Sequence, residues 1–289
     1  MNRVALRGCG CDAEVVLEES FTWRGDQQVR WSRHGSGPPL VFCHGTPWRS
    51  ALWSRIADAL SSDFTVYLWD MLGYGTSTMA DGQDVSLAAQ ASLLADLLQH
   101  WELRQPHLVV HDYGGAVALR AHLLHGTRYR SLALVDVVAL APWGSDFFRL
   151  VAGNAPVFAQ IPPALHEALL RAYITGAAHR PLAGEHLDML AAPWLGAEGQ
   201  AAFYRQIAQA SQRYTDEIEP LYPAIELPVL IAWGTEDTWI PVDRAHRLAE
   251  QISGAELHLI PDAGHLVQLD APEHLTAMLQ RWLMAMAAR

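Results

Sequence analysis

Apolar residues along the chain follow two alternating patterns. Short apolar runs bounded by turn residues alternate with longer stretches in which apolar residues recur at helical spacing. The short runs predict strands at 15–23, 29–33, 39–43, 65–70, 106–111, 131–137, 228–233 and 256–260. The longer stretches predict helices at 50–60, 86–103, 115–125, 242–252 and 272–286. This alternation is typical of an α/β fold with a mostly parallel sheet of eight strands flanked by helices.

The alternation is interrupted between the sixth and seventh predicted strands. Residues 138–225 lack strand-like runs and contain prolines, alanines, tryptophans and tyrosines amid helix-like stretches. We interpret this segment as an inserted helical cap. The core of the fold is then expected to comprise 14–137 and 226–289, with 1–13 as an N-terminal tail.

Composition narrows the function classes. Of the 289 residues, 51% are hydrophobic and 18% are charged, which is enough apolar material for a packed core. The net charge is −11 and no basic cluster interrupts the acidic balance, so neither nucleic acid nor an anionic membrane surface is an expected partner. The longest apolar runs contain Asp136, Pro142, Pro228 or Asp237, so no membrane-spanning segment is expected.

The start of the chain and the cysteines add two expectations. No apolar stretch near Met1 is long enough for a signal peptide, so a cytoplasmic location is expected. Cys9 and Cys11 resemble half of a metal site, but no second pair at suitable spacing completes it. We therefore expect no metal and assign both cysteines to the tail.

The most informative segment surrounds Asp112. In Val110-His111-Asp112-Tyr113-Gly114-Gly115, a carboxylate stands between a predicted strand and a predicted helix, with small residues nearby that permit a steep turn. A capping aspartate at a helix N-terminus is the alternative interpretation. Two later strand ends favour a catalytic role, because Asp237 follows the run 228–233 and His265 follows the run 256–260.

The order of these residues resembles that of the α/β-hydrolase superfamily, in which nucleophile, acid and histidine follow successive strands. The resemblance covers residues 20–285 and includes His44-Gly45-Thr46-Pro47, Asp70-Met71-Leu72-Gly73-Tyr74-Gly75-Thr76-Ser77, and the segments of Asp112, Asp237 and His265. It implies the α/β-hydrolase fold. It also implies backbone N–H donors from Thr46 and Tyr113 for an oxyanion.

Asp136 is a second candidate for the acid, because some dehalogenases of the superfamily place theirs at the end of the corresponding strand. Asp237 already occupies the more usual place, so we interpret Asp136 as a structural aspartate.

An aspartate at the elbow is similar to the epoxide hydrolase and haloalkane dehalogenase branch. Carboxylate attack on an sp³ carbon with a leaving group yields an ordinary ester, which water can then hydrolyse. Asp112 would be the nucleophile, and His265, oriented by Asp237, would activate the water. This mechanism needs no cofactor; the expected partners are a small apolar electrophile and water, and the chain is compatible with a homodimer.

The leaving group is a separate question. Epoxide hydrolases use cap tyrosines as donors to the epoxide oxygen, and Tyr173 and Tyr204 are the candidates, so epoxide opening is the leading hypothesis. Tyr113 and Thr46 stand where haloalkane dehalogenases commonly have tryptophan and asparagine, yet carbon–halogen hydrolysis by the same triad stays open. A catalytically silent ligand-binding α/β-hydrolase is the remaining alternative, although such a protein has no need of Asp112, Asp237 and His265 together.

Overall fold

The computed structural model describes residues 17–289. The predicted tail, 1–13, the Cys9 and Cys11 pair and the predicted start of the core at residue 14 lie outside the described residues. Within 17–289, no helix is both long enough and apolar enough to span a bilayer.

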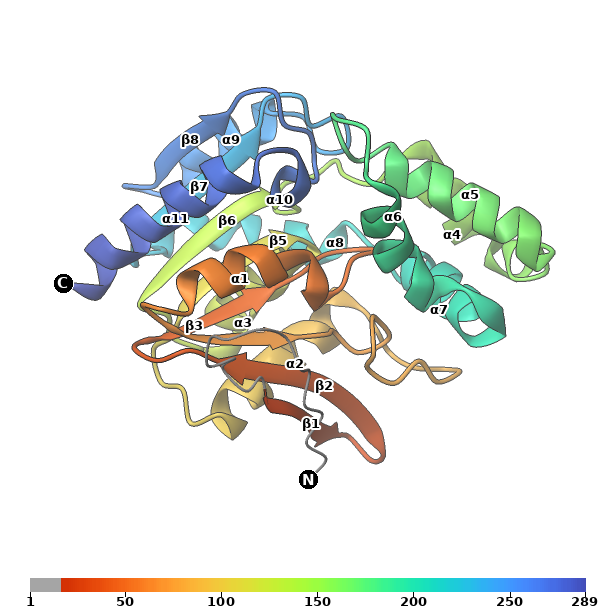
Figure 1. Ribbon diagram of the computed structural model, residues 1–289, viewed down its shortest axis with the longest axis horizontal. Coiled ribbons are helices and arrows are strands. Elements are labelled where there is room, and N and C mark those ends of the chain that lie inside the picture. Colours follow the sequence, from red (N-terminus) through yellow and green to blue (C-terminus); the bar gives the residue numbers. More distant parts are fainter. Residues whose placement is uncertain (1–16) are drawn as a thin grey trace, which may run out of the picture.

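Eight strands form one sheet, as predicted (Figure 1). They are β1 (Leu17–Trp23), β2 (Gln27–His34), β3 (Pro39–Cys43), β4 (Thr65–Trp69), β5 (His107–Asp112), β6 (Ser131–Val137), β7 (Val229–Gly234) and β8 (Glu256–Ile260). Their order is β1-β2-β4-β3-β5-β6-β7-β8; β2 pairs antiparallel with β1 and β4, and the other neighbours are parallel. The carboxyl ends of β3, β5, β7 and β8 therefore meet at one edge, where the predicted site residues follow them.

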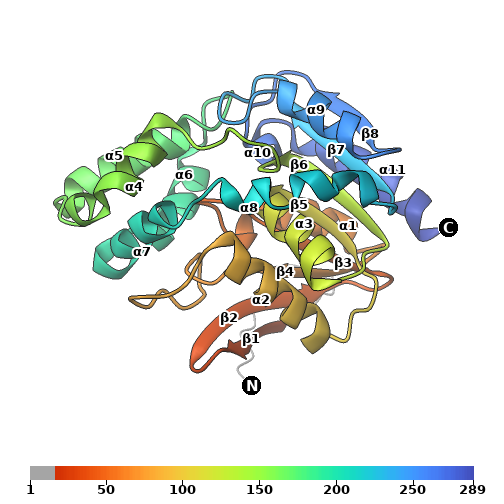
Figure 2. The same ribbon diagram turned by 180° about the vertical axis from the view of Figure 1, so that it is seen from behind.

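Helices cover both faces of this sheet (Figures 1 and 2). The core helices are η1 (Ser50–Trp53), α1 (Ser54–Leu60), α2 (Leu87–His100), α3 (Tyr113–His125), α9 (Asp243–Gln251), α10 (Val267–Asp270) and α11 (Pro272–Ala287). Alternate residues of β3 point to opposite faces: Leu40 and Phe42 pack in the cluster of α1 and α11, and Val41 and Cys43 pack in the cluster of α2 and α3. The sheet is thus buried on both sides, which explains why its central strands are continuous apolar runs.

The segment that we interpreted as a cap is helical. It contains α4 (Asp146–Phe158), α5 (Pro163–Thr175), α6 (Gly184–Ala191), η2 (Ala192–Trp194), α7 (Gly196–Ala208), α8 (Arg213–Asp216) and η3 (Glu219–Ala224). Figures 1 and 2 show α4 to α7 grouped at the end of the molecule opposite the C-terminus. Direct hydrogen bonds hold this segment to the core: Trp194 Nε1–H donates to the Pro47 carbonyl at 2.7 Å, and Arg120 donates to the Tyr214 carbonyl at 2.6 Å.

Candidate active site

Asp112 is held in a strained backbone conformation at the junction of β5 and α3. Its φ is 48° and its ψ is −120°, a region that residues with a side chain rarely adopt. Close neighbours must be small here: a Cβ on Gly45 would lie 2.3 Å from Cβ of Asp112, and a Cβ on Gly114 would lie 2.7 Å from the His44 carbonyl oxygen. The glycines around the turn therefore let the carboxylate stand at the carboxyl edge of the sheet.

The structure brings Asp112, Asp237 and His265 together. His265 Nδ1 lies 2.9 Å from Oδ2 of Asp237, and Nε2 lies 3.4 Å from Oδ2 of Asp112. The other oxygen of Asp237 accepts hydrogen bonds from the backbone N–H groups of Trp239 and Ile240 at 2.8 and 2.9 Å. These bonds fix the Asp237 carboxylate, which fixes the imidazole, so that Nε2 faces Asp112.

The charges around His265 determine its protonation. Burial lowers the pKa of the imidazole, but the carboxylates of Asp237 and Asp112 together raise it more strongly, to about 10. While both carboxylates are ionised, the imidazole is therefore held as a cation between them.

The oxyanion donors differ from the expectation in one detail. The Thr46 backbone N–H donates to Oδ1 of Asp112 at 2.7 Å. Within residues 17–289, the Tyr113 N–H makes no hydrogen bond with this carboxylate, although Tyr113 is the first residue of α3 and follows Asp112 directly. Thr46 is thus the backbone donor to the Asp112 carboxylate.

The charge of Asp112 raises the pKa values of three tyrosines, Tyr74, Tyr113 and Tyr173. Burial raises the pKa of Tyr113 well above its ordinary value, and the nearby groups Tyr74, Asp112 and Tyr173 raise it further. Burial and then Asp112 likewise raise the pKa of Tyr173. The hydroxyl of Tyr113 is buried and has no hydrogen-bond partner within the described chain, and none is formed by the Tyr173 hydroxyl in that range either. Two phenol donors near the nucleophile are therefore available to a substrate.

The Tyr204 hydroxyl is engaged elsewhere in the cap. His166 Nε2–H donates to the Trp194 carbonyl at 2.9 Å, which leaves Nδ1 as the acceptor for the Tyr204 hydroxyl, also at 2.9 Å. Burial is the cause that raises the pKa of Tyr204, without a contribution from Asp112. Of the two cap tyrosines predicted for the site, Tyr173 lies near the nucleophile and Tyr204 donates to His166.

Aromatic rings beside the imidazole were not predicted. Trp239 stacks on His265 with ring centroids 5.2 Å apart and contacts Tyr173 at 4.5 Å. Trp48 stacks on Trp239 at 5.6 Å and also lies beside the imidazole, with ring centroids 6.3 Å apart. These rings come from three segments distant in sequence, so no local pattern indicates that they meet. They give the site an apolar wall.

The cap residue Gln206 was also missed. Its Oε1 accepts hydrogen bonds from the Thr46 hydroxyl at 2.7 Å and from the Tyr74 hydroxyl at 3.1 Å. Its side chain is buried, and Nε2 has no partner in the part of the chain that the structure describes. Gln206 thus connects helix α7 to the loop that holds the nucleophile.

His111 precedes the nucleophile but is not placed as a base. Its Nε2–H donates to the backbone carbonyl of His265 at 2.9 Å. Burial lowers its pKa to about 3, and the neighbouring His265 contributes to this shift, so the ring is neutral. His111 therefore holds the loop of His265 in place.

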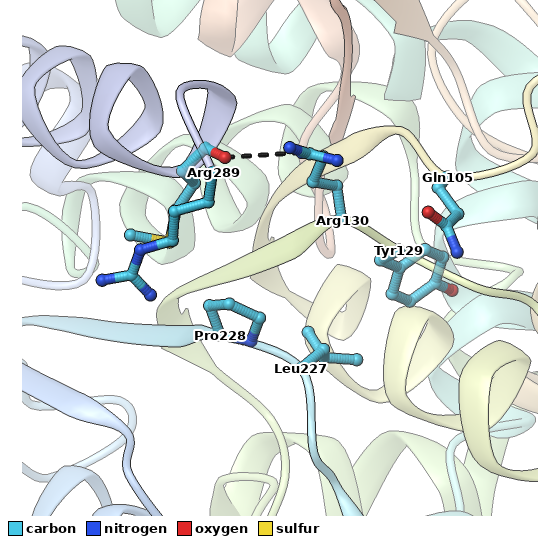
Figure 3. Close-up of a pocket in the computed structure, with 7 residues that line it drawn as sticks. Gln105, Tyr129, Arg130, Leu227, Pro228 and Arg289 are labelled. Carbon is cyan, nitrogen blue, oxygen red and sulfur yellow. Dashed lines mark hydrogen bonds between the residues drawn. The ribbon is translucent and has the colours of Figure 1, made fainter.

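A surface pocket of about 290 Å³ lies away from these residues (Figure 3). Its lining includes Gln105, Arg130 and Pro228, which directly precede or lie just before strands β5, β6 and β7. In it, Arg130 Nε–H donates to the Met286 carbonyl at 3.4 Å (Figure 3). The pocket is at the amino ends of parallel strands, opposite the edge that presents Asp112.

The chain belongs to the alpha/beta hydrolase fold family, whose model matches residues 38–272. Relatives within the family differ in their named activities. The chain is similar to an alpha/beta hydrolase fold protein of Burkholderia ambifaria, with 45% identity, a TM-score of 0.88, and coverage of 92% of this chain and 98% of that one.

One more distant relative and one structure of the same fold illustrate this range. Haloalkane dehalogenase 2 of Mycobacterium tuberculosis is 25% identical over 263 residues, which are 87% of this chain and 90% of that protein. A thermophilic esterase of Thermogutta terrifontis shares the fold with a TM-score of 0.75 at 23% identity, covering 94% of this chain and 99% of that one. The fold therefore does not determine the substrate, and the substrate class has to be inferred from the residues of the site.

Proposed function

We propose that the protein hydrolyses a small apolar alkyl electrophile through a covalent ester on Asp112. The observation that carries the proposal is a carboxylate at the elbow, bound by the Thr46 N–H and within reach of His265. Carboxylate attack on a carboxylic ester would form an anhydride, whereas attack on an sp³ carbon forms a stable ester. An aspartate nucleophile therefore favours alkyl electrophiles over the substrates of an esterase.

The reaction proceeds in two steps. In the first, Oδ2 of Asp112, the oxygen not bound by Thr46, forms a bond to the substrate carbon, and the leaving group departs with its electron pair. In the second, His265 takes a proton from a water whose oxygen attacks the carbonyl carbon of the ester. The oxyanion then forms on Oδ1, at the Thr46 N–H. As this intermediate collapses, the bond between the carboxyl carbon and Oδ2 breaks, and the alcohol leaves with Oδ2 and the proton held by His265. The Asp112 carboxylate is regenerated with the oxygen of the water and releases that oxygen's remaining proton. For an alkyl halide, the overall reaction converts the alkyl halide and one water into an alcohol, a halide ion and one proton.

Alkylation also changes the base. The Asp112 carboxylate is one of the two charges that raise the pKa of His265, and the ester carries no charge. Ester formation therefore lowers the pKa of the imidazole and favours its neutral form, which is the form that can accept a proton from water. The enzyme would thus gain its base at the step that needs one.

We propose a carbon–halogen bond as the bond that is broken. The named activity of the Mycobacterium tuberculosis relative supports this choice, as does the buried hydroxyl of Tyr113, the residue after Asp112, which no other group in residues 17–289 uses. Epoxide opening is the second candidate and is favoured by the free Tyr173 hydroxyl near Asp112. It has less support than the sequence alone suggested, because the other expected donor, Tyr204, is bound to His166.

Intact-protein mass spectrometry of His265→Gln tests the proposal. The variant lacks the base, so it should accumulate the ester when incubated with a panel of bromoalkanes, chloroalkanes and epoxides. A haloalkane should add its alkyl group and release halide, whereas an epoxide would add its whole mass. The double variant with Asp112→Asn is the control and should stay unlabelled. Absence of any label, together with absence of turnover by the wild type on the panel, would contradict the proposal.

A further inference from the structure

We infer that Gln206 of the cap is a ligand for the leaving group, and that its side-chain amide donates to the halide ion as Asp112 is alkylated. The inference rests on the proposed function and adds a residue to it. In this inference both the cap and the core contribute residues to the leaving-group site.

The first support is the position of Gln206 relative to the nucleophile. A chain of two hydrogen bonds connects them: Thr46 donates its backbone N–H to Asp112 and its hydroxyl to Oε1 of Gln206. The Tyr74 hydroxyl donates to the same oxygen. The Gln206 amide therefore binds the side chain of the residue whose backbone N–H holds Asp112.

The second support is an unused donor. Oε1 accepts two hydrogen bonds and is satisfied, but the two N–H groups of Nε2 are buried without a partner within residues 17–289. A buried donor without a partner is destabilising, so such groups in native proteins call for an explanation. An anion that is present only during turnover provides one.

The third support is that the proposed donor is a neutral amide in a site with a negatively charged carboxylate. A lysine or arginine at this place would pair with the Asp112 carboxylate and weaken its nucleophilicity. An amide carries no net charge, so it can stabilise a departing anion without forming an ion pair with Asp112. Position 46 is threonine and offers no amide, and Gln206 brings one to it from the cap.

Gln209 provides an internal comparison. It follows the last turn of α7 and also connects the cap to the core, but both ends of its amide are used. Oε1 accepts from the Val85 N–H at 2.8 Å, and Nε2 donates to the Gln83 carbonyl at 2.7 Å. A purely bridging glutamine in this protein is thus fully bonded, and Gln206 is not.

The experiment compares Gln206→Glu, Gln206→Leu and Gln209→Leu. The glutamate keeps an acceptor for Thr46 and Tyr74 but replaces the N–H donors, whereas Gln209→Leu removes a bridge of the same kind outside the site. Bromide affinity is measured by titrating tryptophan fluorescence with sodium bromide at constant ionic strength, since Trp48 and Trp239 lie beside His265. The alkylation rate is measured separately, by adding each variant to His265→Gln and following the mass adduct from a bromoalkane.

Loss of one hydrogen bond to an anion is expected to weaken bromide binding and slow alkylation by about 10- to 100-fold in both Gln206 variants. Gln209→Leu should change neither by more than about threefold. If the His265→Gln parent is labelled but Gln206→Glu keeps the affinity and rate of its parent, the inference is overturned and the proposed function stands. If neither bromide binding nor labelling occurs in any protein, both fail. Melting temperatures of all variants separate a loss of donors from a loss of fold.

Discussion

Asp136 and Asp237 bring two buried carboxyl groups together behind His265. Oδ1 of Asp136 accepts the Gly234 N–H at 2.8 Å, while Oδ2 has no other partner among the described residues. Burial raises the pKa of Asp136 well above its ordinary value, and the charge of Asp237 raises it further. These causes favour the neutral form of Asp136, and Asp237 is the carboxyl group that pairs with the imidazole.

Asp136→Asn should consequently be a mild change. Asparagine is neutral, can donate an N–H where the protonated acid has its O–H, and tolerates the positive φ of 44° at this position. We expect kcat to stay within about threefold of wild type, whereas Asp237→Asn should lower it by at least about 100-fold, because the imidazole loses its anionic partner. Steady-state kinetics on whichever panel substrate is turned over measures both. Equal losses in the two variants would mean that Asp136 carries the charge.

Gly45→Ala should damage the site more than the fold. The added methyl group would lie 2.3 Å from both Cβ and Oδ1 of Asp112, so the nucleophile or the Thr46 loop must move. Overpacking of this kind costs about 1–3 kcal/mol in stability, and displacement of the nucleophile should reduce alkylation by about 100-fold or more. Thermal unfolding and the alkylation rate are compared with those of Gly184→Ala, whose methyl group meets no atom within 4 Å. Unchanged alkylation in Gly45→Ala would show that this contact does not hold the nucleophile.

Most of the sheet could be predicted from the sequence because its strands are buried on both faces. The run 39–43 is continuous and apolar, and its predicted bounds match β3. Helix α3, predicted from residue 115, begins at Tyr113, because the strained turn at Asp112 leads directly into the helix. The spacing of apolar residues carries no information about such a turn.

Part of the candidate site could likewise be predicted from the sequence, and part could not. The strand ends predicted that Asp112, Asp237 and His265 would meet, since parallel strands present their carboxyl ends at one edge. Gln206 and Tyr204 depend on how the cap packs, which has no local signature. The sequence around Tyr204 could not reveal that His166 accepts the Tyr204 hydroxyl.

Two tyrosine variants should separate catalysis from packing. Tyr204→Phe leaves Nδ1 of the buried His166 without its donor, which should cost about 1–3 kcal/mol in stability and change kcat by less than about threefold. Tyr173→Phe removes a hydroxyl that has no partner in residues 17–289, so its stability should change little.

The substrate panel then compares the effect of Tyr173→Phe on epoxides with its effect on haloalkanes. If an epoxide is turned over, Tyr173→Phe should slow its opening by about 100-fold, because the alkoxide loses its acid, while haloalkane turnover should stay within about threefold. Urea unfolding and kinetics on both substrate classes check these values. A large decrease in kcat of Tyr204→Phe at unchanged stability would indicate that Tyr204 acts in catalysis.

The stability of the folded protein should depend on the protonation of His265. Its pKa is raised from 6.5 to about 10 in the folded state, so the folded state holds the proton more tightly than the unfolded chain. This contribution is fully present below pH 6.5 and is lost as the pH rises through 10. Its upper limit is about 5 kcal/mol.

The difference in the free energy of unfolding between wild type and Asp237→Asn isolates this contribution, because other titrating groups are common to both proteins. We expect the advantage of the wild type to shrink steadily from pH 7 to pH 10, since Asp237 is the largest of the groups that raise the pKa of His265. Urea unfolding at pH intervals across this range measures it. A difference that stays constant over the range would mean that His265 is already neutral beside an ionised Asp112, and the proposed gain of a base on alkylation would lose its foundation.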